Sequence, residues 1–209
     1  NKKIIEQDHV PLNTPLKDLP QSSTTLVEEL AKRVKRARSA GKPVMITFGA
    51  HAIKNGLGTV LVHLIEHTWV THLATNGAGI IHDWEFAYQG KSCEDVEQMV
   101  NEGRFGNWED TGFFINLSLN IGAFEGLGYG ASVGAMIERE GVTIPNAEEL
   151  IQVAKQEIES APEKAAAAAD LLAVIQQFNL EPGWMEIAHP WKRFSIQAGA
   201  YRHSVPFTG

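Results

Sequence analysis

The sequence is poor in cysteine and in long apolar runs. Its 209 residues include one cysteine, Cys93, which excludes a disulfide within the chain. No secretory signal pattern opens the sequence, so we expect a reducing compartment, with the cytoplasm as the default. No window approaches the roughly 20 apolar residues that a membrane span needs. We therefore expect a soluble protein with no membrane association.

Positive charge is also scarce. Eighteen Lys and Arg stand against 25 Asp and Glu, which gives a net charge of −7, and the basic clusters are short. Binding to nucleic acid needs an extended basic surface, so we expect no nucleic-acid partner. What the chain does have is 44% hydrophobic residues, enough for a globular core.

Strands, glycine loops and helices alternate in the first half of the chain. Residues 44–48 are a short apolar, β-branched run before Gly49, residues 57–68 have helical apolar spacing, and residues 70–75 read as a second strand. Parallel strands need such crossovers. The sequence therefore predicts an α/β fold, with a Rossmann-like parallel sheet and helices on both faces. We expect an N-terminal arm over residues 1–22 and a single α/β domain over 23–209.

Other segments carry weaker signals. Helices are predicted over 22–39, with Ser23 or Thr24 as the cap, and over 94–102, 128–139, two parts of 147–177, and 191–201 before a strand at 205–208. Residues 113–119 are compatible with a strand. Residues 126–131 fit the G-x-G-x-x-A dinucleotide pattern, but no acidic residue ends a strand at the required distance, so we interpret them as a tightly packed helix entry.

Two glycine loops fall at the carboxyl ends of the predicted strands, where α/β proteins bind ligands. Backbone N–H groups and helix N-termini in such loops favour phosphate. The alternative is that the glycines only make βα turns. The candidate loop residues comprise glycines that admit a phosphate-bearing ligand and neighbouring polar side chains: Gly49, Gly56, Gly77, Gly79, His51, Asn55, Thr75 and Asn76.

A histidine and two carboxylates follow the second loop directly. His82 can move a proton near neutral pH, and Asp83 and Glu85 can hold an amine cation. The alternative is that the carboxylates only favour the start of a helix, where negative charge is stabilising. We predict that His82, Asp83 and Glu85 are catalytic.

A possible metal motif lies between the two loops. His63, Glu66 and His67 match the H-x-x-E-H pattern, in which two histidines bind zinc and the glutamate activates water. A third ligand is not identifiable, and this helix face is expected to point at solvent or at a neighbouring subunit. We therefore assign no metal to the chain and keep zinc hydrolysis at these residues as an alternative function.

Residues 47–56 and 70–83 resemble the first two βα units of deoxyhypusine synthases and their prokaryotic relatives, and residues 194–207 resemble a later helix and strand of that fold. The resemblance implies NAD as cofactor, spermidine as aminobutyl donor, a protein lysine or a diamine as acceptor, and a homotetramer. It assigns the amine or nicotinamide contact to the region of Asp83 and Glu85. It assigns NAD contacts to Gly49, Ala50, His51, Asn55, Gly56, Thr75, Asn76 and Gly77.

The chain also departs from the family pattern. The family has Thr-Ser-Asn where this chain has Gly49, Ala50 and His51, and the family segment with the imine-forming lysine has no counterpart. We therefore expect the domain to be incomplete at its C-terminus relative to the family. A non-catalytic or shortened member that only binds ligand is the alternative to an NAD-dependent aminobutyl transferase.

Overall fold

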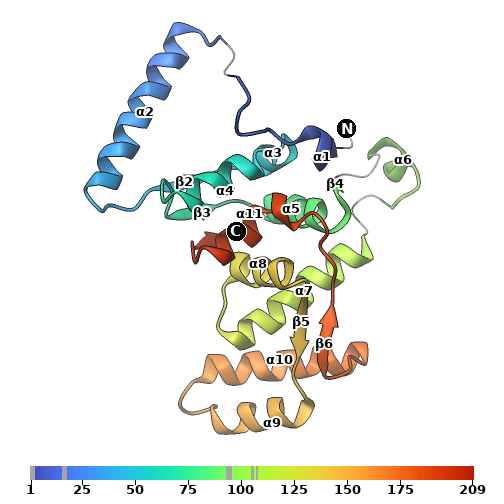
Figure 1. Cartoon of the computed structure of the whole chain (residues 1–209). Coiled ribbons are helices and arrows are strands. Elements are labelled where there is room, and N and C mark those ends of the chain that lie inside the picture. Colours follow the sequence, from blue (N-terminus) through green and yellow to red (C-terminus); the bar gives the residue numbers. More distant parts are fainter. Residues whose placement is uncertain (1–2, 16–17, 93–95, 105, 107) are drawn as a thin grey trace.

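The chain has a mixed α/β architecture in which helices surround a small parallel sheet (Figure 1). A computed structural model describes residues 3–15, 18–92, 96–104, 106 and 108–209. The parallel sheet has the order β2-β3-β7, formed by β2 (Met45–Thr47), β3 (His72–Ala74) and β7 (Phe207–Thr208). The predicted α/β class and its parallel strands are thus confirmed. Coverage of both sheet faces in the Rossmann manner stays a prediction.

The crossover between β2 and β3 is helical. It consists of α4 (Gly58–Glu66), which lies where the spacing predicts a helix, and α3 (Ala50–Lys54), which forms between Gly49 and Gly56, where a loop was predicted. Helix α4 buries Leu61, Val62 and Ile65, which lie on one side of the helix because residues three and four apart are neighbours. Strand β3 is held in the middle of the sheet, where Leu73 is fully buried.

The remaining elements enclose this sheet and extend away from it. Helix α8 packs against α7 and α11, while α9 and α10 pack together at the end of the molecule far from the sheet (Figure 1). Their bounds are β1 (Lys3–Ile4), α1 (Ile5–Asp8), α2 (Gln21–Ser39), α5 (Gly77–Gln89), β4 (Lys91–Ser92), α6 (Val96–Asn101), α7 (Glu109–Glu125), α8 (Tyr129–Arg139), β5 (Gly141–Ile144), α9 (Ala147–Gln156), α10 (Pro162–Phe178), β6 (Gly183–Glu186), the 3₁₀ helix η1 (Lys192–Phe194) and α11 (Ile196–Arg202).

Several local predictions are wrong. Residues 113–119 are not a strand but the middle of α7, whose apolar side chains face several neighbours. Helix α2 begins after Pro20, whose carbonyl accepts from the backbone N–H groups of Ser23 and Thr24, and no side chain caps it. The antiparallel pairs β1–β4 and β5–β6 were not expected. Cys93 and the first residues of the predicted helix 94–102 lie outside the described residues.

The tight helix entry at residues 126–131 is confirmed. A Cβ atom on Gly130 would lie 2.3 Å from the carbonyl oxygen of Phe207, so α8 approaches β7 at backbone distance. Of the three glycines, only Gly130 serves helix–strand packing, whereas Gly126, at φ +79°, ends α7 and Gly128 precedes α8.

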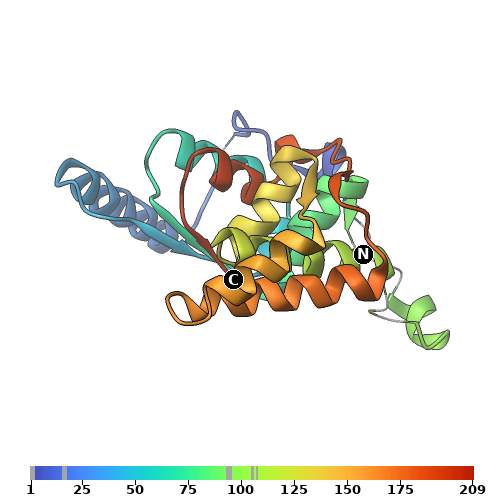
Figure 2. The same ribbon diagram turned by 90° about the horizontal axis from the view of Figure 1, so that it is seen from below.

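Helix α2 stands apart from the rest of the molecule in both views (Figures 1 and 2). None of its residues is buried, and Leu26, Val27 and Leu30 are each more than half exposed. Across the described part of the chain, no helix combines the length and apolarity that a bilayer crossing requires.

Candidate functional site at the carboxyl edge of the sheet

The two predicted glycine loops lie side by side. Strands β2 and β3 pair in parallel with Thr47 opposite Ala74, so the segments that follow the two strands leave the sheet at the same edge. The hydroxyl of Thr75 donates to the carbonyl oxygen of Phe48 at 2.8 Å. A Cβ atom on Gly49 would lie 4.0 Å from Nδ2 of Asn76. Residues from Gly49 and from 75–77 thus form one continuous surface.

Helix α5 begins at this surface. Asn76 caps it, since its side-chain oxygen accepts from the backbone N–H of Gly79 at 3.0 Å. Asn76, Gly77 and Ala78 are exposed, and nothing lies within 4 Å of a Cβ placed on Gly77. Because the first N–H groups of a helix lack intrahelical partners, this end of α5 can accept an anionic group.

Other predicted loop residues lie away from this surface or are covered by other parts of the chain. Gly56 has φ +76°, and a Cβ on it would lie 2.2 Å from the carbonyl oxygen of Asp8, so the N-terminal segment covers it. Asn55 caps the far end of α3 beside Gly56. Gly79 is packed against Thr75, whose Oγ1 would lie 2.2 Å from an added Cβ. Gly56 and Gly79 therefore allow close packing of the chain and leave no open space for a ligand.

The first turn of α3 supplies the remaining candidates. Ala50 follows the N-cap residue Gly49 directly, and the side chain of His51 is exposed.

His82 and Glu85 form a pair on α5, one turn beyond the open helix end. His82 Nδ1 lies 2.7 Å from Glu85 Oε2, and the two side chains are 20% and 10% exposed. The carboxylate fixes the orientation of the imidazole. The pair can therefore hold and pass a proton.

Asp83 faces the opposite way, into the protein. Its carboxylate accepts from Oγ of Ser195 at 2.6 Å, from the backbone N–H groups of Ile196 and Gln197 at 3.0 and 3.1 Å, and from Nε2 of Gln197 at 3.1 Å. Burial raises the pKa of Asp83, and the four donors oppose that effect. Asp83 thus anchors the start of α11 to α5. It has no exposed oxygen to offer an amine.

The partners of Asp83 were not predicted from the sequence. Ser195 is the N-cap of α11 and its hydroxyl also accepts from the backbone N–H of Ala198 at 3.1 Å. A serine just before an apolar helical stretch is a recognisable cap signal. No pattern near Asp83, more than 100 residues earlier, indicates that it would meet this cap.

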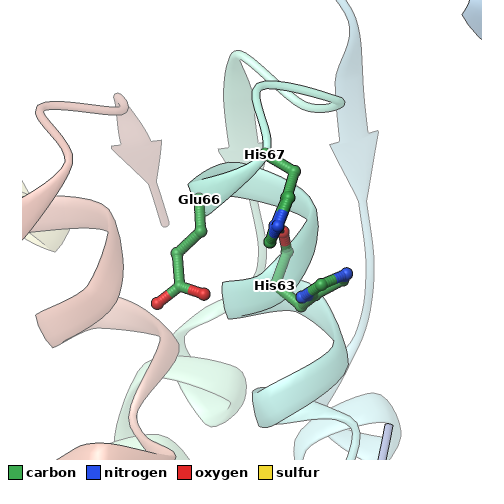
Figure 3. A group of neighbouring side chains, drawn as sticks. All are labelled: His63, Glu66 and His67. Carbon is green, nitrogen blue, oxygen red and sulfur yellow. The ribbon is translucent and has the colours of Figure 1, made fainter. Parts of the chain in front are cut away.

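The H-x-x-E-H residues lie at the end of α4 (Figure 3). His63 is half-buried, while Glu66 and His67 are exposed, so the expected solvent-facing placement is confirmed. Atoms of the three side chains that can bind a metal lie within 4.8 Å of one another. None of the three belongs to the surface around Gly49 and Asn76.

A groove of about 530 Å³ lies between α7 and α10. Phe113 and Phe178 provide much of its apolar wall. It shares no residue with the two loops.

Comparison of the sequence with models of known families and with curated proteins gives no match.

Proposed function

We propose that the chain binds NAD at the carboxyl edge of the parallel sheet and oxidises a spermidine-like polyamine, as the first half of an aminobutyl transfer to an acceptor amine. The observation that carries the proposal is the open surface that Gly49 shares with Asn76 and Gly77 at the start of α5. The resemblance to deoxyhypusine synthases supplies the identity of the cofactor and the amine. A Rossmann-like sheet, a homotetramer and a cytoplasmic location belong to the same proposal.

The fit of a dinucleotide depends on backbone that a ligand can approach. Gly49 and Gly77 meet this condition, because added Cβ atoms would lie in nearly open space. Ala50, Asn76 and the first N–H groups of α5 complete the set that would hold a pyrophosphate. Gly56 and Gly79 would contribute only by shaping the two turns.

The catalytic role falls to His82 and Glu85. When bound, NAD supplies the acceptor for a hydride from the carbon beside an amine nitrogen. That oxidation also releases a proton, which the His82–Glu85 pair can hold at an imidazole nitrogen. The Glu85 carboxylate can attract the cationic amine. In this scheme Asp83 holds α5 against α11 and does not touch the substrate.

A binding experiment tests the cofactor claim. NAD is titrated into tag-free protein by calorimetry, with and without spermidine. Gly77→Asp places a carboxylate where the phosphate would lie, and negative charge at a helix N-terminus favours folding, so the variant should stay folded. We expect it to weaken NAD binding at least about 10-fold, which equals about 1.4 kcal/mol.

Gly112→Asp is the matched control, because Gly112 also lies in a helix first turn with open space around it. It should bind NAD as the unmodified chain does. No binding with or without spermidine, or equal binding by Gly77→Asp, would refute the cofactor claim.

An absorbance experiment tests the reaction. Spermidine and NAD together should produce a rise in the absorbance band of reduced nicotinamide. His82→Ala and Glu85→Gln should each lower that rate by about 10²-fold or more, because each removes part of a proton-transfer pair. NAD binding without any absorbance change would support a non-catalytic, ligand-binding protein instead.

A further inference from the structure

The last turn of α4 carries metal-ligating side chains that the proposed NAD site does not use. His63, Glu66 and His67 project from one helical turn, because residues three and four apart are neighbours on a helix surface (Figure 3). We propose that they bind one divalent transition-metal ion of the zinc type, with water completing the coordination.

The hydrogen bonding of His67 suits a metal ligand. Its Nδ1 lies 2.9 Å from the carbonyl oxygen of His63, and a carbonyl oxygen only accepts, so Nδ1 carries the hydrogen. The neutral ring therefore keeps its lone pair on Nε2. Histidines that bind metals usually donate their other ring N–H to a carbonyl or carboxylate in this way.

The spacing of the three side chains allows coordination with small side-chain rotations. Tetrahedral zinc with bonds of about 2.1 Å needs ligand atoms roughly 3.4 Å apart. One ring nitrogen of each histidine and one Glu66 oxygen lie within 4.8 Å of one another, and the two imidazole rings have centroids 4.0 Å apart. Leu61 and Ile65 are buried and fix the helix beneath them, so only the side chains must move.

The donor set selects the kind of ion. Two imidazoles and one carboxylate are the ligands of open zinc sites, whereas Mg²⁺ and Ca²⁺ prefer oxygen donors alone. A carboxylate at Glu66 also offsets the charge of the ion. Its Oε1 lies 3.7 Å from Nε2 of His203, which leaves its second oxygen for the metal.

Neighbouring arginines do not block the cluster. The guanidinium of Arg38 lies over the ring of Trp69, 4.0 Å from the ring centroid, and that of Arg202 makes two hydrogen bonds to Glu138 at 2.8 and 3.0 Å. Each positive charge thus has its own partner, which reduces its repulsion of a bound cation.

Zinc titration of the tag-free, chelator-dialysed chain tests the proposal, with calorimetry for Zn²⁺ and visible absorption for Co²⁺. We expect one ion per chain. Loss of a second-shell partner already costs 10–100-fold in metal affinity, so His67→Ala and His63→Ala should each weaken zinc binding at least about 10-fold. His67 is exposed, so its replacement should leave the fold intact, which circular dichroism checks.

His51→Ala is the matched control, since it removes an exposed imidazole from another helix. It should bind zinc within about twofold of the unmodified chain, well inside the effect of losing a ligand. Substoichiometric zinc, equal binding by His67→Ala, or displacement of zinc by millimolar Mg²⁺ would overturn the proposal. None of these outcomes bears on NAD binding, so the two proposals fail independently.

Discussion

His189 is a fully buried imidazole with neither ring nitrogen hydrogen-bonded to the described part of the chain. The rings of Tyr88 and Trp84 flank it, with centroids 5.9 and 6.4 Å away. Burial lowers the pKa of His189 from 6.5 to about 4, and the Ile187 backbone and the charge of Glu140 offset only part of that effect. The folded protein therefore keeps this ring neutral in mild acid, where the unfolded chain protonates it.

This difference predicts a loss of stability in acid. The contribution of neutral His189 is complete above pH 6.5 and declines as the pH falls towards 4, because only the unfolded state takes up the proton. At about 1.4 kcal/mol per pKa unit, roughly 3 kcal/mol is lost by pH 4. Urea unfolding at pH 7.5 and 5 should show the decline, and His189→Phe should flatten it.

A measurement on the unmodified protein checks the same point without a variant. The imidazole proton resonances of His189 should keep their neutral shifts at pH 5. A midpoint near 6.5 for His189 would contradict the assignment.

Asp83 predicts a second effect at a single position. Asp83→Ala leaves the donors of Ser195, Ile196 and Gln197 buried without their acceptor. Removing one side of such a buried charged network costs about 3 kcal/mol or more. Asp170→Ala, at an exposed position of α10, is the control and should change the free energy of unfolding by less than about 0.5 kcal/mol. A loss below about 1 kcal/mol for Asp83→Ala would mean that these donors find other partners.

At the scale of elements, replacing two helical glycines by alanine should change the free energy of unfolding in opposite directions. A Cβ on Gly134 in α8 would lie 2.4 Å from the carbonyl oxygen of Gln197 in α11, whereas nothing lies within 4 Å of one on Gly112 in α7. Gly134→Ala should destabilise by about 1–2 kcal/mol, because overpacking outweighs the gain in helix propensity. Gly112→Ala should stabilise by about 0.5–1 kcal/mol.

Chemical denaturation of both variants provides the measurement. A stabilising Gly134→Ala would show that α8 and α11 separate easily, contrary to the close packing between them.

The elements with one dominant periodicity could be predicted from sequence. Helix α4 carries such a pattern because it buries one face, and β2 and β3 are short apolar runs, although β2 buries no residue and β3 buries only Leu73. Helix α7 could not be predicted, since its apolar residues lie on several sides of the helix and a short apolar stretch fits a strand equally well. The β5–β6 pair could not be predicted either, because two helices lie between its strands and no hairpin turn joins them.

The candidate site was predictable in part for a related reason. Gly49 and Asn76 each lie two residues beyond the end of a strand, so parallel pairing alone brings them together. Gly56 is covered by Asp8, and Asp83 is buried against Ser195. No local sequence pattern predicts either contact. Local spacing locates a strand end, but distant segments decide which of its residues stay open.

At the scale of the whole molecule, the absence of buried residues in α2 predicts fast hydrogen exchange. A 19-residue helix with no buried side chain is only marginally stable by itself in water. Mass spectrometry should show its amides exchanging far faster than those of α8, which buries Val133, Met136 and Ile137. Equal protection of α2 and α8 would show that another surface, such as a second copy of the chain, covers Leu26 and Leu30.

The sheet order also determines which strand pairing forms late in folding. Strand β7 pairs with β3, and the hydrogen bond between Thr208 and Leu73 joins residues 135 positions apart. Closing so long a loop costs entropy before any contact repays it, so this pairing belongs to the late steps of folding. During synthesis on the ribosome, this side of β3 stays unpaired until residues 207–208 have been made, and until then its exposed edge can recruit other chains.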